Sequence, residues 1–193
     1  MNTIITVEEF KEFYPSSSLT DMQIQLYCEM MTEYIHELAG VSLEEGEITE
    51  TLKGNGQDTL YLKKRPVTSI NSLEGNRTSF DDVVINEYKN GIKRLYGVFY
   101  KGQDIFENTA SITSKSEIVK VTYTGGYKYG AEGNVPTSLK YALAGMIQSY
   151  VDETAGEGKL KAYSRDDVSY TFKDSIERNQ SFIAIIGRYI WKE

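Results

Sequence analysis

The chain contains very little of the side-chain chemistry on which most enzyme sites depend. Among its 193 residues there is one cysteine, Cys28, and one histidine, His36. A single cysteine excludes an intramolecular disulfide and fits a reducing compartment. Zinc sites combine several imidazole or thiolate ligands. Eight residues of predicted helix place Cys28 and His36 roughly 12 Å apart, too far to share a proton. We therefore predict that the protein is not an enzyme and has no catalytic residue, metal or cofactor.

Positive charge and long apolar runs are also scarce. Lys and Arg number 21 against 28 Asp and Glu, which gives a net charge of −7. A protein that holds DNA by its phosphates needs a basic patch, and the only basic cluster here is residues 63–65. The most apolar stretch, "FIAIIGRYIW", is ten residues long and contains Arg188. It is too short to cross a bilayer, and the N-terminus lacks the pattern of a signal peptide. We expect neither tight DNA binding nor a membrane location.

Other patterns that resemble sites have simpler interpretations. Cys28 falls on an apolar helical stripe, which favours a small core residue. Glu29 and Glu33 lie on the same helical face as His36, which favours a surface ion pair. The acidic run Glu44–Glu47 lacks the Asp-rich loop of a calcium site and is interpreted as solvated. Glycine-rich stretches at 54–58 and 123–130 lack the Gly-Lys-Ser/Thr of a phosphate loop and are interpreted as turns. Nothing places the carboxylate pairs Asp81–Asp82 and Asp166–Asp167 across a cleft.

Hydrophobic periodicity divides the chain into helical ends and a β-rich middle. Capping boxes at Thr6 with Glu9 and at Thr20 with Gln23 predict two helices, the second ending at Gly40. Pro136 predicts the start of a third helix, and a fourth is expected at about 175–190. The stripes predicted to be buried are Ile24, Cys28, Met31, Ile35 and Leu38, then Leu139, Ala142, Leu143, Met146 and Tyr150.

The middle of the chain has a period of two, which predicts five or six short strands. "ITETL" and "LYL" are expected to form a hairpin across "GNGQD", and "VVINEY" and "IKRLY" a second hairpin across "KNG". "EIVKVTYT" is expected to be a strand with Val119, Val121 and Tyr123 on one face. We predict an α+β fold, a small helical bundle formed by N- and C-terminal helices with an inserted antiparallel β lobe. The expected parts are 1–47, N-terminal helices; 48–124, β insertion; and 125–193, C-terminal helices completing the bundle.

The C-terminal helix carries more apolar surface than one packing face requires. Gly187 in its middle suggests the close approach of another backbone, since glycine costs about 1 kcal/mol there. One interpretation is that the helix is wholly buried in its own bundle. The other is that one side contacts a partner protein, for which the candidate residues are Phe182, Ile183, Ile186, Tyr189, Ile190 and Trp191. The fifteen tyrosines of the chain suit either an interface or β-strands.

The order of several short motifs resembles the head–tail connector family of tailed bacteriophages, which comprises adaptor and head-completion proteins. These motifs are a strand and glycine turn, "VKVTYTGGY" from Val119, followed by "VPTSLKYA" from Val135. Further matches are "GNG" from Gly54, "LYL" from Leu60, "RPVTSI" from Arg65 and the tail "YSRDDVSYTF". The resemblance covers most of the chain and is poorest from about Phe80 to Ser116.

This resemblance implies a structural virion protein that forms a ring at the portal vertex, connects the DNA-filled head to the tail and extends the DNA channel. Its implied partners are the portal protein, a tail-proximal neck or tail-completion protein, and other copies of itself in a homo-oligomeric ring, a dodecamer if it follows the portal. Genomic DNA would pass through without tight binding. The implied location is the head–tail junction of the virion, with assembly in the host cytoplasm.

Two other functions stay open at this point. The first is a neck or tail-completion protein of the same virion, whose partner would be the tail. The second is a glycan- or receptor-binding β module that uses tyrosines as platforms. Binding to glycans would distinguish the β module from the two virion roles.

Overall fold

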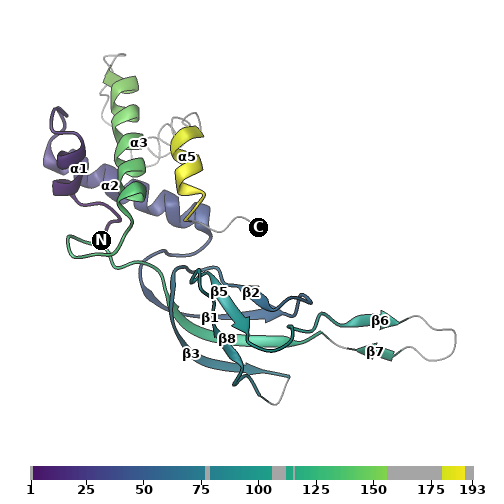
Figure 1. The fold of residues 1–193 in the computed structure, drawn as a ribbon. Helices are drawn as coiled ribbons and strands as arrows, with labels where there is room; N and C mark the ends of the chain where they lie inside the picture. Colours follow the sequence, from purple (N-terminus) through teal and green to yellow (C-terminus); the bar gives the residue numbers. More distant parts are fainter. Residues whose placement is uncertain (1, 77–78, 106–111, 115, 156–179, 190–193) are drawn as a thin grey trace. The chain divides into compact units, whose positions relative to one another are not determined.

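The computed structural model describes the chain except for residues 1, 77–78, 106–111, 115, 156–179 and 190–193 (Figure 1). The chain divides into two compact units. The helical unit is formed by Met1–Glu44 with Tyr127–Glu193, and the β lobe by Glu45–Gly126. The predicted fold class is confirmed, since helices from both ends of the chain share one core and an antiparallel β lobe is inserted between them.

The first two helices begin where local hydrogen bonding dictates. Helix α1 is Val7–Phe13 and helix α2 is Asp21–Ala39. In the first capping box the Thr6 hydroxyl accepts from the Glu9 amide at 3.2 Å, and the Glu9 carboxylate accepts from the Thr6 amide at 3.0 Å. Thr20 and Gln23 make the same exchange at α2. Gly40 ends α2 with a φ of 63°, a left-handed conformation that glycine adopts without strain. Both predicted starts and the predicted stop are confirmed.

The C-terminal part of the helical unit consists of α3, Thr137–Ala155, and α5, Gln180–Ile186. The carbonyl of Pro136 accepts from the amides of Leu139 and Lys140, so the proline directly precedes the first turn, as predicted. The two predicted stripes are buried with one exception: Leu38 is 38% exposed, and Ala39 takes its place in the core. The contact with the core therefore passes from Leu38 to the last residue of α2.

The helices form one apolar core with the segment that precedes α1. The largest fully buried side chains of this core are Phe10, Ile4, Ile5, Ile24, Met31, Ile35 and Leu43. Lys140 of α3, only 8% exposed, donates to the Glu9 carboxylate of α1. The capping residue of α1 therefore also fixes that helix to α3.

The β lobe contains two three-stranded antiparallel sheets (Figure 1). The first has the order β1–β8–β3, formed by Gly46–Lys53, Ile118–Gly125 and Val67–Gly75. The second has the order β2–β5–β4, formed by Thr59–Tyr61, Gly91–Arg94 and Val83–Ile85. A separate two-stranded sheet pairs β6, Gln103–Ile105, with β7, Ile112–Ser114. The lobe core is Leu60, Leu62, Val67, Ile92, Phe99, Val119, Val121 and Tyr123.

One of the two predicted hairpins is wrong. β1 does not pair with β2; it pairs along all eight residues with β8, and β2 pairs with β5. The "GNGQD" turn therefore connects two different sheets. The long ladder to β8 offers β1 more hydrogen bonds than the three-residue β2 can.

The hairpin of β4 and β5 and the buried face of β8 are confirmed. In that hairpin the residue with positive φ is Lys89, at 52°. Gly91 has another role: a Cβ there would collide with the carbonyl oxygen of Leu60 on β2. The glycine therefore permits the close pairing of β2 with β5.

The two ends of the β lobe lie next to each other, as expected for an inserted element. Gly46, at the start of β1, is the register partner of Gly125, at the end of β8. A pair of adjacent ends lets the lobe interrupt the helical sequence without separating the helices that flank it.

Candidate interaction surfaces

His36 forms a ring pair with Tyr129, which the sequence did not predict. Its Nε2 lies 2.7 Å from the hydroxyl of Tyr129, and the two rings are stacked with centroids 6.1 Å apart. Burial raises the pKa of the Tyr129 phenol, with a further contribution from the nearby Glu44 charge. The phenol is therefore protonated at neutral pH. The contact joins α2 to the loop that precedes α3 and so stabilises the helical unit.

Cys28 is fully buried in the helical core, as predicted. Burial raises the pKa of its thiol to about 12, and the Glu29 charge adds to the shift. The nucleophilic thiolate is therefore scarce at neutral pH. The hydroxyl of Thr32 donates to the backbone carbonyl of Cys28 at 2.8 Å, a hydrogen bond within α2.

We expect Cys28 in the folded protein to resist thiol reagents at pH 8 and to react at once in denaturant. The folded state favours the neutral thiol. The resulting contribution to the free energy of unfolding is fully present below the pKa of the thiol in the unfolded chain, about 8.5. It is lost as the pH rises from there toward about 12. Labelling with a chromogenic disulfide, with and without guanidinium, measures the difference in Cys28 reactivity between the native and the unfolded protein. Rapid labelling of the native protein would contradict the buried position.

The described acidic residues that the sequence singled out have separate polar partners. Glu44 accepts from the Asn2 side chain at 2.7 Å, and Glu47 from the Asn71 side chain at 2.6 Å. Asp81 accepts from Ser79, whereas Asp82 is paired with Arg94. Asp166 and Asp167 lie outside the described residues. Within the described part of the chain, no group of three His, Cys, Asp or Glu side chains is arranged to hold a metal ion.

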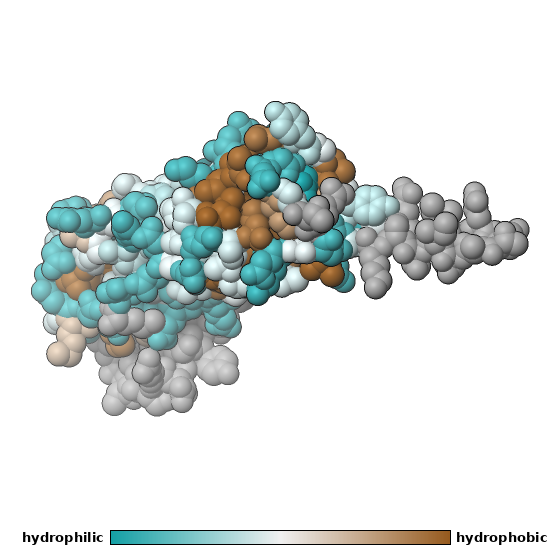
Figure 2. All heavy atoms as spheres, turned by 90° about the horizontal axis from the view of Figure 1, so that it is seen from below, coloured by the Kyte–Doolittle hydropathy of each residue, from teal (hydrophilic) through white to brown (hydrophobic). Residues whose placement is uncertain are grey.

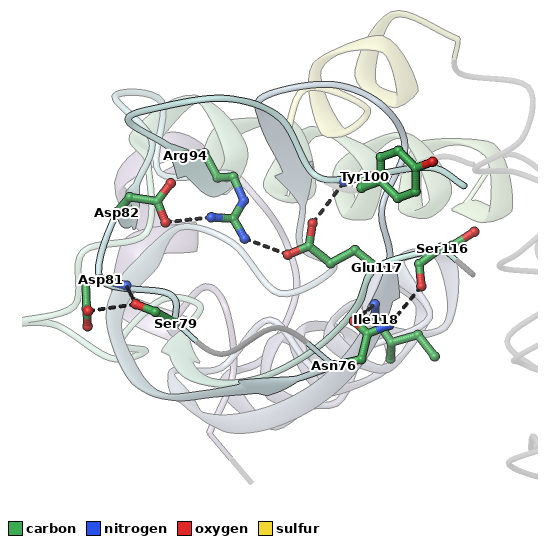
Figure 3. Close-up of polar contacts among 9 residues, drawn as sticks. All are labelled: Asn76, Ser79, Asp81, Asp82, Arg94, Tyr100, Ser116, Glu117 and Ile118. Carbon is green, nitrogen blue, oxygen red and sulfur yellow. Dashed lines mark hydrogen bonds and ion pairs between the residues drawn. The ribbon is translucent and has the colours of Figure 1, made fainter. Parts of the chain in front are cut away.

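A buried ionic cluster in the β lobe was not predicted (Figure 3). Arg94, 5% exposed, contacts Glu117 at 2.5 Å and Asp82 at 2.6 Å. Its guanidinium carbon also lies 5.0 Å from the ring centroid of Phe99, within the range of a cation–π contact. The other Glu117 oxygen accepts from the Tyr100 amide at 2.9 Å.

This cluster fixes the base of the β6–β7 hairpin. Tyr100 precedes β6 and Glu117 follows β7, and the Glu117 amide donates back to the Tyr100 carbonyl at 2.8 Å. Figure 3 shows Arg94 between Asp82 and Glu117, with Tyr100 beyond. An alternating strand pattern gives no sign of this arrangement, because Arg94 and Glu117 lie far apart in the sequence.

The candidate partner-binding residues of the C-terminal helix mostly contact their own unit. Ile186 is 1% exposed, and Phe182, Ile183 and Tyr189 pack against the helical core. The Tyr189 hydroxyl is also hydrogen-bonded to Ser138 of α3 at 2.5 Å. Ile190 and Trp191 lie outside the described residues. The exposed positions of α5 are polar or small: Gln180, Ser181 and Ala184.

Within the described part of the chain, the tight glycine contact of α5 is at Gly145 and not at Gly187. The nearest atoms to a Cβ at Gly187 are carbonyl oxygens of its own preceding turn, at 3.3 and 3.7 Å. At Gly145 of α3, by contrast, a Cβ would collide with the ring of Phe182. Gly145 is therefore the residue that allows α5 to lie against α3.

Both units carry exposed apolar side chains. Figure 2 shows hydrophobic atoms gathered over the β lobe. The exposed large side chains of the lobe are Tyr61, Val84, Tyr88, Leu95, Tyr96, Val98, Tyr100 and Ile118. An open groove of about 680 Å³ also runs along the edge strand β3, lined by residues 70–75 and 79–81. In the helical unit the exposed apolar residues include Met22, Leu26 and Tyr141.

The described helices include none that is both long and apolar enough for a membrane span.

A family model described as "HCP: Head completion protein" matches residues 3–178 of the chain. The chain belongs to this head completion protein family. A search of curated proteins finds no match. Among solved structures, the chain is similar to one titled "Neck of empty GTA particle computed with C6 symmetry", with 14% identity and a TM-score of 0.44. The match covers 91% of this chain and 88% of that one.

Membership of the head completion protein family makes this chain a structural protein of the virion, with its place at the junction of head and tail. The resemblance noted in the sequence is thereby confirmed. A structural role also agrees with the surroundings of His36, Cys28, Glu47 and Asp82, each of which contacts neighbours that stabilise the fold.

Proposed function

We propose that the protein forms a ring at the portal vertex, extends the DNA channel and presents a surface to the tail. The observation that carries this proposal is the family match over residues 3–178. The partners would be the portal protein on one side and a neck or tail-completion protein on the other. A ring of identical subunits is the arrangement that closed rotational symmetry favours, and twelve copies would match a dodecameric portal.

The distribution of charge supports a channel through which DNA slides. Residues 1–44 contain eight Asp and Glu and a single Lys, whereas the rest of the chain contains twenty residues of each sign. The whole net charge of −7 therefore belongs to the segment of α1 and α2. Twelve copies would bring roughly −84 to the ring, a field that repels phosphates. DNA would pass without tight binding.

We further propose that the segment following α5 contributes to the portal contact. Since Phe182, Ile183, Ile186 and Tyr189 pack in their own unit, the contact would depend on Ile190 and Trp191, which follow them. A tryptophan is a suitable anchor, because aromatic residues dominate interface energetics. A neck or tail-completion role in the same virion is the alternative, in which the portal would not bind.

The test is a pull-down with purified portal rings of the same virus, followed by imaging of the complex along its axis. Trp191→Ala is expected to weaken binding by about 2 kcal/mol or more if the residue is a hot spot. Arg188→Ala, a change at an exposed position of the same segment, serves as the control and should bind as the unmodified protein does. Absence of portal binding by the unmodified protein would contradict the portal assignment and favour the neck role.

A further inference from the structure

Strand β3 forms one edge of the β1–β8–β3 sheet, and within the described residues β8 is the only strand paired with it (Figure 1). The outward side of an edge strand carries backbone amides and carbonyls that the sheet does not use. Proteins commonly protect such an edge with Lys or Pro, and residues 67–75 contain neither. The register shifts of β3 lie before Ser72, and from Ser72 to Gly75 its pairing with β8 is regular. The second half of β3 is therefore an edge to which a further strand can add.

The open groove of about 680 Å³ follows this edge. Every residue from 70 to 75 contributes to its lining. Since successive side chains of a strand point to opposite faces, a groove lined by all of them runs along the edge and not over one face. Its apolar side chains, Ile70, Leu73 and Phe80, pack at the margin of the lobe core. Gly75 allows the Phe80 ring to lie against the strand, because a Cβ there would collide with that ring.

The charges in the groove are all negative. Its lining contains Glu74 and Asp81 and neither Lys nor Arg. Glu74 has a countercharge on the neighbouring strand, Lys120 at 3.4 Å. Asp81 exchanges hydrogen bonds with Ser79 at 2.7 and 3.2 Å, and the described part of the chain provides no ion pair for it. A segment with a Lys or Arg beside Asp81 would supply the countercharge and so fix its own register.

We propose that β3 accepts an extended segment of another virion protein as a fourth strand of its sheet. The backbone of the segment would pair with the outward edge of residues 72–75. Its alternate apolar side chains would contact Ile70, Leu73 and Phe80. A Lys or Arg of the segment would lie at Asp81. In this mode of recognition main-chain hydrogen bonds give affinity and side-chain contacts give specificity. The inference rests on the proposed head–tail role only for the place where the partner is met.

The chemistry of the groove favours an extended chain of a different protein over other occupants. A helix satisfies its own backbone groups and would leave the edge of β3 unpaired. Only three of the nine lining residues are apolar, so a docked apolar face would find little to bury. Two β3 strands of neighbouring copies would bring two acidic grooves together without a countercharge. An extended segment with alternating apolar residues and one basic residue matches the edge, the apolar side chains and the charge together.

The experiment selects displayed peptides of random sequence, about nine residues long to match β3, on the full chain. Counter-selection on a Ser72→Lys variant removes peptides that bind elsewhere, because a lysine on an edge strand opposes strand addition. Ser72 is exposed and lines the groove. We expect the enriched peptides to alternate apolar with polar residues and to share one Lys or Arg. No enrichment, or enrichment without alternation, would overturn the proposal.

Synthetic forms of an enriched peptide test the backbone pairing. N-methylation of alternate residues removes the donors along one side of the extended peptide and keeps its side chains. We expect one of the two methylated forms to lose about tenfold or more in affinity and the other less than about twofold, since only one side faces β3. Hydrogen exchange of the full chain should show new protection at residues 72–75. Equal affinity of both methylated forms would overturn the proposal.

Variants of the chain test the edge and the charge separately. Ser72→Lys should weaken peptide binding by about tenfold or more. Gln57→Lys adds the same charge at an exposed position outside the groove and should change binding by less than about twofold. Asp81→Asn should reduce the preference for Lys over Glu in the peptide by about threefold or more at low salt, whereas Glu87→Gln, outside the groove, should not. Equal effects of a variant and its control would overturn the proposal.

Sedimentation of the unmodified protein and of Ser72→Lys decides whether a second copy of the chain is the occupant. If the substitution abolishes self-association, the edge of β3 is a contact between copies and the proposal is wrong. Circular dichroism confirms that each variant is folded, as expected for exposed positions. Peptide binding at β3 by a protein unable to bind portal rings would contradict the proposed function but support the strand site. Portal binding without any enriched peptide would support the function and overturn this inference.

Discussion

Replacing Arg94 with methionine is expected to lower the free energy of unfolding of the β lobe by about 3–5 kcal/mol. The change leaves Glu117, whose side chain is 1% exposed, as a buried carboxylate without its countercharge. Asp82 loses its 2.6 Å contact at the same time. The cost comes mainly from the stranded charge, because an ion pair as a whole contributes little once desolvation is counted.

Hydrogen exchange in the full chain measures this effect, with amides of β5 and β8 reporting on the lobe and amides of α3 as the internal reference. Lys93→Met is the matched control. Lys93 is adjacent on the same strand, but its 3.4 Å pair with Asp58 is about half exposed on both sides. Such a surface pair is worth about 0–1 kcal/mol. Equal effects of the two substitutions would contradict the role of the buried cluster.

A second variant distinguishes the stranded charge from lost packing. Adding Glu117→Gln to Arg94→Met should recover about half or more of the lost stability, because an amide is far less costly to bury than a charge. The Gln oxygen can still accept from the Tyr100 amide, which in the unmodified protein donates to Glu117 at 2.9 Å. No recovery would indicate that the contacts of the guanidinium with Phe80 and Phe99 matter more than its charge.

Replacing Gly145 with leucine is expected to displace α5 from α3 and to cost about 1–3 kcal/mol. Leucine is the better helix former by about 1 kcal/mol, so propensity alone predicts the opposite sign. The structure decides the matter, because any Cβ at this position collides with the Phe182 ring. Loss of hydrogen-exchange protection at α5 amides, together with a lower melting temperature, measures the displacement.

Two further substitutions make this prediction specific. Phe182→Ala in the Gly145→Leu background should restore part of the docking of α5, because it removes the ring that collides. Gly187→Ala is the control, since a Cβ there meets only carbonyl oxygens of its own turn at 3.3 Å or more. It should change stability by less than about 1 kcal/mol. If Gly145→Leu left α5 protected, the close approach of Phe182 to α3 would be refuted.

The sequence by itself determined the features that depend on neighbours along the chain. Capping boxes bring together residues three apart, so Thr6 with Glu9 and Thr20 with Gln23 could be read directly. The left-handed stop at Gly40 and the alternating burial of β8 are likewise local. The position of Cys28 followed from the period of its helix. The order of short motifs, taken together, identified the family.

Only the tertiary structure decided which distant residues meet. The turn at "GNGQD" indicated a local hairpin, but β1 forms its ladder with β8, and Gly46 faces Gly125. Leu38 continues the stripe of α2 in sequence and yet is 38% exposed, whereas the next residue, Ala39, is buried in the core. Arg94 with Glu117, and Gly145 with Phe182, are pairs that no period relates. Their partners are set by sheet order and helix packing, which arise from the balance of burial over the whole chain.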